Sequence, residues 1–357
     1  MEWKQCLTAS EKSLYLKFIK TLYKDDPFYV DYTTPVLNEI FAGKSPFAQN
    51  LWHESYWIMD SDELVGVLTY LIHKNYSDVL QVAFLEYLDL KGLPELILDH
   101  AYQIAKDKGV KEIVVGLNGH VNYGLGLSVE QSHRPTFGSV YTKAYYSKHF
   151  KALGLEETKL VSFQYPWESK EFPLSLEKKN RFYGRFKFRI MQKETFDSDI
   201  EIYTALNNKC FGEHPFYFPR TVEEDRFLFK DLKFFMEKGS LIFAEDDGKP
   251  IGFLLWYPDW GEIMRRGETL SVITFIRKIL FGKKVKGFKI VEWAVLPEYR
   301  RKGVPVGLLA HCYELVKDRQ FTKCKTSWIV EANKDSSGFG DKWAEPYERY
   351  AVYTMKL

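Results

Sequence analysis

The sequence predicts an α/β protein in which one α/β unit occurs twice. Three observations carry this prediction. Residues 289–333 have the pattern of a strand, a basic glycine turn, a helix and a second strand. Each half of the chain has an apolar hairpin, at Ser55–His73 and at Leu241–Tyr257. An 18-residue segment also occurs twice, and a repeat so widely spaced indicates duplicated domains rather than a solenoid.

The repeated segment is KGLPELILDHAYQIAKDK at residues 91–108 and KGVPVGLLAHCYELVKDR at residues 302–319, with eight of 18 positions identical. The residues before it differ in charge, because Arg300 and Arg301 align with Asp89 and Leu90. An acid and a leucine would repel or ignore an anion that two arginines attract. We therefore expect the first copy to be structural, and the second copy to bind a ligand.

The remaining elements follow in the same order in both halves. The first half is expected to contain helices at 10–23, 35–41, 93–108 and 144–153, and strands at 80–88, 112–116 and 159–165. The second half is expected to contain helices at 200–209, 226–238 and 306–320, and a strand at 325–331. The predicted boundaries are an N-terminal domain at 1–166, a charged linker at 167–184 and a C-terminal domain at 185–357.

The turn after the strand at 289–295 has the features of a phosphate site. It ends a strand and opens a helix, so backbone N–H groups there lack helical partners and the helix dipole favours an anion. Gly303 lets a ligand approach the backbone, and Arg300, Arg301 and Lys302 supply positive charge. Pro305 removes one N–H donor, although proline is compatible with a first helical turn.

The segment Val295-Leu-Pro-Glu-Tyr-Arg300-Arg-Lys-Gly303-Val304 resembles the acetyl-CoA loop of the GCN5-related N-acetyltransferases (GNAT), and it departs from that pattern at Pro305. The order of elements across both halves resembles bacterial tandem-GNAT proteins. The resemblance implies two GNAT-like domains, each a mixed, mostly antiparallel twisted sheet flanked by helices. It implies acetyl-CoA or another acyl-CoA as co-substrate, bound by residues Val295, Arg300, Arg301, Lys302, Gly303, Val304 and Asn333.

The resemblance implies an acyl-CoA-dependent N-acyltransferase, and we expect acetyl transfer to a primary amine by direct attack on the thioester in the C-terminal domain. Such a transfer needs a base, an oxyanion donor and a proton for the leaving thiolate. Glu292 lies between apolar neighbours on the strand before the loop, which would raise its pKa and favour a base. It could equally face outward or pair with a lysine, and a β-bulge would reverse its face. The resemblance implies the backbone N–H near Val295 as the oxyanion donor and a tyrosine as the acid. Tyr350 is the chosen candidate, because 335–341 has a loop pattern where the family has a helix.

Composition sets the other limits. A net charge of +2 gives no chain-wide attraction to nucleic acid, and no apolar run approaches the length of a membrane span. The four scattered cysteines suggest neither a disulfide framework nor a zinc site, and Glu213-His214 is not a metal motif. We expect a cytoplasmic protein without a metal, acting on a small-molecule or peptide amine. The oligomeric state is not predicted.

Two other functions remain open. A non-catalytic module that binds CoA or a nucleotide would agree with Pro305 and the missing acid helix. A peptidyl-type transferase that uses aminoacyl-tRNA would agree with the basic stretch from Arg277 to Lys289. That stretch ends an apolar segment, and we expect residues 270–281 to form a helix buried against the sheet or the other domain, with a solvated basic tail. A position beside the acceptor cleft and a membrane-surface role are the alternatives for this helix.

Overall fold

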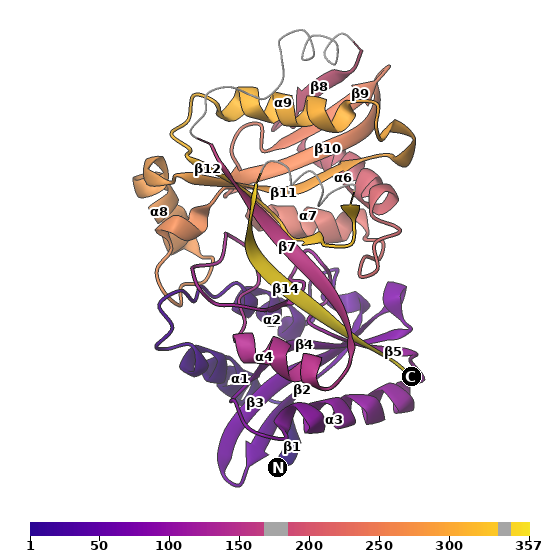
Figure 1. The fold of residues 1–357 in the computed structure, drawn as a ribbon, viewed down its shortest axis with the longest axis vertical. Helices are drawn as coiled ribbons and strands as arrows, with labels where there is room; N and C mark the ends of the chain where they lie inside the picture. Colours follow the sequence, from indigo (N-terminus) through magenta and orange to yellow (C-terminus); the bar gives the residue numbers. More distant parts are fainter. Residues whose placement is uncertain (168–184, 335–343) are drawn as a thin grey trace.

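The computed structural model describes residues 1–167, 185–334 and 344–357. Its two halves lie one above the other and are joined by two long strands that cross the middle of the molecule (Figure 1). The first half contains β1 (Glu2–Gln5), α1 (Ala9–Leu22), α2 (Thr33–Ala42), β2 (Leu51–Asp60), β3 (Glu63–His73), β4 (Val79–Tyr87), α3 (Leu93–Lys108), β5 (Glu112–Val115), β6 (Leu127–Ser128), α4 (Ala144–Ala152) and β7 (Glu156–Pro166).

The second half repeats the hairpin, the crossover helix and the parallel strand. It contains β8 (Lys187–Ile190), α6 (Phe196–Cys210), α7 (Val222–Leu232), β9 (Leu241–Asp246), β10 (Lys249–Pro258), α8 (Val272–Phe281), β11 (Gly287–Val295), α9 (Val304–Val316), β12 (Lys323–Thr326), β13 (Ile329–Val330) and β14 (Glu345–Lys356). The predicted α/β class, with a large, mostly antiparallel sheet flanked by helices, is confirmed.

The repeat is visible in the start of its helices. Both α3 and α9 begin after a glycine with positive φ, Gly92 at 82° and Gly303 at 87°, and both carry proline in the first turn. Glycine adopts this left-handed conformation without the steric cost that a Cβ brings, and proline has the φ that a first turn needs. The two KG-x-P segments are therefore the same structural device, used once in each half.

The strands of both halves form one continuous sheet in the order β1-β2-β3-β4-β5-β14-β7-β12-β11-β10-β9-β8. The C-terminal strand β14 lies between β5 and β7, so the last residues of the chain complete the sheet of the first half. β7 in turn pairs with β12 and β13 of the second half. The predicted division into domains at 1–166 and 185–357 stays a prediction, since most of the linker lies outside the described residues.

Two sequence expectations are corrected. The strand predicted at 325–331 is divided into β12 and β13, and β13 pairs with β7 instead of continuing beside β11. The helix predicted at 270–281 is present as α8, but its predicted burial is wrong, because most of its apolar side chains face outward. Polar residues of α8 hold it to the protein, together with Phe275, which packs against the core.

Candidate active site

The site is formed where two parallel strands separate. β11 and β12 pair from Gly287 to Ile290, and the N–H of Ser327 donates to the Ile290 carbonyl at 2.8 Å. Beyond this point the chain leaves β11, because β13 pairs with β7. The gap opens a cavity of about 1550 Å³ that is lined by residues from both strands and from the first half of the chain.

A β-bulge decides which side chains of β11 enter this cavity. Glu292 lies opposite Leu255 on β10, whereas Ile290 lies opposite the next residue, Trp256, so Val291 is an extra residue in β11. A bulge shifts the alternation of side chains by one position. Consequently Lys289 and Glu292, three residues apart, share one face of the sheet instead of lying on opposite faces.

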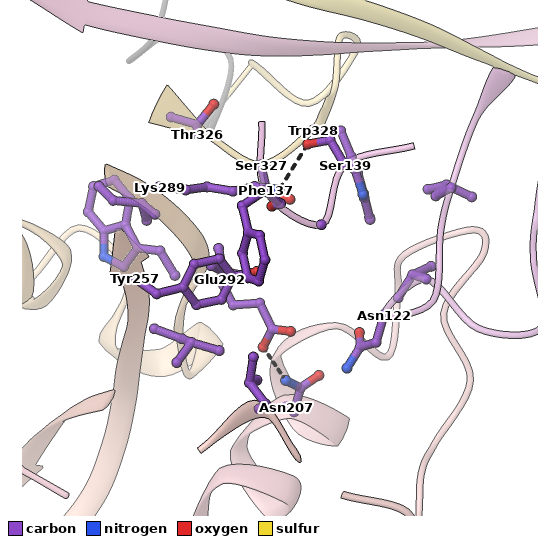
Figure 2. A pocket seen from close by; sticks show the side chains of 18 of the residues that line it. Asn122, Phe137, Ser139, Asn207, Tyr257, Lys289, Glu292, Thr326, Ser327 and Trp328 are labelled. Atoms are coloured by element: carbon purple, nitrogen blue, oxygen red, sulfur yellow. Dashed lines mark hydrogen bonds between the residues drawn. The ribbon is translucent and has the colours of Figure 1, made fainter. Parts of the chain in front are cut away.

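Glu292 has two hydrogen-bond donors on helix α6. The hydroxyl of Tyr203 donates to Oε2 at 2.6 Å, and the side-chain amide of Asn207 donates to the same oxygen at 2.7 Å (Figure 2). Burial raises the pKa of Glu292 to about 7, although both hydrogen bonds favour the charged form and lower it. Both bonds fall on Oε2, so Oε1 is the oxygen available to take a proton from a ligand.

Lys289 introduces a second buried charge on the same face. Its ammonium donates to the Phe137 carbonyl at 3.2 Å and to the Ser139 hydroxyl at 2.9 Å, both in the first half of the chain. Burial lowers the pKa of Lys289 to about 8. Figure 2 shows Asn122, also from the first half, pointing into the cavity toward Glu292. The site is therefore shared by the two halves.

The basic turn forms the other end of the cavity. Arg300 and Arg301 line the cavity, and Pro305 and Val306 in the first turn of α9 line it as well. Arg301 has φ of 62°, a left-handed conformation that is uncommon outside glycine. The first-turn N–H groups of α9 lack intrahelical partners, and Pro305 reduces their number by one. An anion at this end would meet the positive end of the helix dipole and the two arginines.

The predicted oxyanion donor is on the open side of β11. The N–H of Leu296 donates to the Ile251 carbonyl at 2.9 Å, on the β10 side. Because successive N–H groups of an antiparallel strand point to opposite edges, the N–H of Val295 points away from β10. On that edge β12 accompanies β11 only as far as Ile290 in the described residues. The Val295 N–H is therefore directed into the gap between the separating strands.

The predicted site residues take different places. Glu292, Val295, Arg300, Arg301 and Asn333 line the cavity. Lys302, Gly303 and Val304 form the turn and the helix start, and the Val304 side chain is buried in the core. Tyr350 is buried on β14, beside Gly126 and in a cluster of apolar side chains, rather than in the cavity wall. The loop predicted at 335–341 lies outside the described residues.

Sequence reasoning missed Tyr203, Asn207 and Lys289. The spacing of Tyr203 and Asn207 could have predicted their common role, because residues four apart on a helix share one face. A tyrosine and an asparagine on the same face form a polar patch. His214 also lines the cavity, and burial lowers its pKa to about 4, so it stays neutral near pH 7. In the ranges 1–167, 185–334 and 344–357, no cluster of three or more His, Cys, Asp or Glu side chains is suited to a metal ion.

The corresponding place in the first half is closed. There β4 and β5 are the parallel pair, and the cavity near their separation measures only about 30 Å³. The Asn118 side chain occupies this region and accepts a hydrogen bond from the Phe84 N–H at 2.8 Å. Asp89, where the second half has an arginine, lies 3.2 Å from His149. The observed contrast agrees with a structural role for the first copy.

Comparisons with known proteins agree with this geometry. Residues 200–341 match the acetyltransferase (GNAT) family. A tandem GNAT protein from the clavulanic acid biosynthesis pathway superposes with a TM-score of 0.56 at 11% identity, covering 99% of this chain and 98% of that one. A glucosamine N-acetyltransferase region of a fungal β-N-acetylglucosaminidase gives a TM-score of 0.60 at 15% identity, covering 99% of this chain and 38% of that one. Residues 200–341 thus match the GNAT family, and the chain as a whole shares the fold of a tandem GNAT protein.

Two further proteins match this chain by sequence, at higher identity than these structures. Protein YghO of Escherichia coli is 21% identical over 369 residues, covering 98% of this chain and 94% of its own length. The bacterial ceramide synthase of Caulobacter vibrioides is 22% identical over 177 residues, covering 47% of this chain and 46% of its own length.

None of the helices in the described part of the chain is long and apolar enough to cross a membrane.

Proposed function

We propose that the protein is an acyl-CoA-dependent N-acyltransferase whose active site lies in its second half. The observation that carries this proposal is the cavity between the separating strands, which has the two arginines and the start of α9 at one end and Glu292 on its wall. Arg300, Arg301 and the α9 N–H groups would hold the CoA phosphates. Asn333 lines the same cavity and would contact the pantetheine arm.

In the proposed reaction the amine nitrogen attacks the thioester carbonyl carbon, and Glu292 Oε1 takes the proton that the amine loses. The Val295 N–H stabilises the negative charge on the carbonyl oxygen as the C–N bond forms. The C–S bond then breaks, the oxygen returns to a carbonyl, and the thiolate leaves and takes a proton from water. Tyr350 has no part in this scheme, because its side chain is buried in an apolar cluster and does not line the cavity.

The size of the cavity favours large substrates. Its volume of about 1550 Å³ exceeds the roughly 300–1,000 Å³ of an ordinary small-ligand pocket. Aromatic and aliphatic side chains dominate its lining, among them Phe211, Phe227 and Leu309. The Caulobacter relative is named a ceramide synthase, and ceramide is an N-acylated lipid. Both observations favour a long apolar acyl group or an apolar amine over acetyl transfer to a small polar amine.

The tRNA alternative loses part of its support, because three of the six cations in the basic stretch are engaged within the protein, while Lys283, Lys284 and Lys286 are exposed. Arg277 pairs with Glu268 at 2.6 Å, Lys278 lies 3.5 Å from Glu237, and Lys289 is buried at the site. These cations are engaged within the protein and cannot serve a nucleic acid as freely as exposed ones. The acyltransferase function therefore remains the one that the geometry supports best.

Release of free thiol tests the proposed function. The protein would be incubated with acetyl-CoA or long-chain acyl-CoAs, each with and without polar and long-chain amines. The proposal expects amine-dependent thiol release that is fastest with the long-chain pair and is lost on Arg300→Glu. CoA binding without thiol release for any pair would instead indicate the non-catalytic binding module.

A further inference from the structure

Helix α8 presents its apolar side to the outside. Five of its apolar residues follow the spacing of one helix face, and each exposes about half of its surface or more. They are Val272 at 74%, Ile273 at 59%, Ile276 at 48%, Ile279 at 68% and Leu280 at 65%. Phe281 and the neighbouring Phe234 add exposed aromatic surface at 41% and 51%. Figure 1 shows α8 at the outer edge of the second half. A contiguous exposed apolar patch of this kind marks an interaction site.

The polar side of the same helix faces the protein and fixes this orientation. Thr274 is fully buried, and its hydroxyl donates to Glu268 at 3.0 Å. Arg277 pairs with Glu268 at 2.6 Å, and the Lys278 ammonium donates to the Phe234 carbonyl at 2.8 Å. Turning the apolar face inward would break these bonds and leave Glu268 without its two partners on α8. The contacts of its polar residues therefore hold the apolar face of α8 outward.

The charges within the segment that carries this face are positive. Lys283 and Lys284 are exposed in the turn that follows α8, and no acidic residue occurs from Thr269 to Lys289. The nearest acid in the sequence, Glu268, is occupied by Arg277 and Thr274. An apolar helix face beside exposed lysines complements an anionic lipid surface, where the apolar side chains enter the acyl boundary and the lysines meet the headgroups.

We propose that α8 docks the protein on an anionic lipid bilayer, lying in the plane of the interface. At ten residues α8 is too short to span the bilayer, so only surface attachment is compatible with its length. The large cavity is lined in part by Val272 and Phe275 of α8 and by Leu270, which lies two residues before the helix. Docking would therefore bring one wall of the cavity next to the bilayer. This inference goes beyond the proposed function, because docking requires no turnover.

Vesicle sedimentation tests the proposal with the full-length protein. Vesicles of phosphatidylcholine with phosphatidylglycerol should bind the protein, and vesicles of pure phosphatidylcholine should bind it less. The double variant Ile276→Ser/Ile279→Ser should lower binding about tenfold or more, because it removes apolar surface from the interface. Lys283→Glu/Lys284→Glu should lower binding to the anionic vesicles and remove its salt dependence.

A matched control separates docking from general stickiness. Leu14→Ser/Leu96→Ser changes two exposed leucines on α1 and α3, at 42% and 39% exposure, and should leave vesicle binding unchanged. Equal melting temperatures would show that the variants fold. Vesicle binding that survives Ile276→Ser/Ile279→Ser overturns the proposal. The absence of vesicle binding by the unaltered protein also overturns the proposal. If that protein forms a dimer in light scattering, and the two serine substitutions dissociate the dimer, the apolar face covers a second copy of the chain instead.

Discussion

Glu292 on β11 and Asn207 on α6 are joined by a 2.7 Å hydrogen bond in which the amide donates to the carboxylate, although 85 positions separate them in the chain. The bond favours the charged form of Glu292, while burial favours the neutral form. The two effects leave the pKa at about 7, where a carboxylate can both take and release a proton at neutral pH.

The first prediction is a pH profile. A general base must be deprotonated, so kcat/KM should rise with pH through about 7. Asn207→Leu removes a donor that favours the charged carboxylate and should move this rise to higher pH. Asn38→Leu, an exposed position on α2, serves as the control and should leave the profile in place. An unshifted profile in Asn207→Leu would mean that another group is the base.

Replacing the base itself gives the second prediction. Glu292→Gln should lower turnover about 100-fold or more at neutral pH while CoA binding is kept. The folded-state pKa of about 7 lies above the ordinary value of 4.5, so the folded protein holds this proton more tightly than the unfolded chain does. Stability should therefore fall as pH rises from about 4.5 to about 7, and the Gln variant should lack this loss. Urea unfolding at pH 5 and pH 8 would compare the two proteins, and equal pH dependence would contradict the assignment of the pKa.

The third prediction concerns β14, the C-terminal strand that completes the sheet of the first half. β14 lies between β5 and β7, with residues 345–356 paired along its length. Removing residues 345–357 should expose the edges of both neighbours and unfold the first half, because β5 and β7 do not pair with each other. Removal of Leu357 alone, which is half-exposed, is the control and should be tolerated. Hydrogen exchange would follow each half, and native protection of β5 in the shortened chain would refute the prediction.

A buried ion pair gives the fourth prediction. Asp259 lies 2.9 Å from Lys325, with side-chain exposures of 2% and 8%, and it accepts the Phe137 N–H at 2.8 Å. Asp259→Ala leaves a buried ammonium and a buried N–H without this partner, which should cost about 3–5 kcal/mol of stability. Asp78→Ala breaks the exposed pair with Lys111 at 2.8 Å and should cost less than about 1 kcal/mol. Urea unfolding measures both, and equal costs would contradict the argument.

Local patterns predicted the elements well where the signal is short-range. Residues 93–108 form α3 as expected, because an αL glycine and a first-turn proline start the helix and Gly109 ends it. The charge contrast between Arg300 and Asp89 likewise indicated which half contains the open cavity. One cavity is lined by five of the residues predicted for the site: Glu292, Val295, Arg300, Arg301 and Asn333. Their roles stay predictions.

Long-range features escaped prediction. The pairing of β14 with β5 depends on a partner more than 200 residues away, and alternation in either strand does not reveal it. The bulge at Val291 depends on the register of β10, so the face of Glu292 remained open. For α8 the apolar run favoured burial, yet Thr274, Arg277 and Lys278 bind the protein and turn that run outward.

Calorimetric titration with CoA tests whether the second half alone binds the co-substrate. We expect one CoA per chain, because in the described residues only the second half combines the arginine turn with an open cavity. Arg300→Glu should abolish binding by reversing charge beside the phosphates, whereas Lys91→Glu at the matching turn of the first half should leave it intact. Two equivalent sites, or unchanged binding in Arg300→Glu, would show that CoA binding does not depend on the second half in this way.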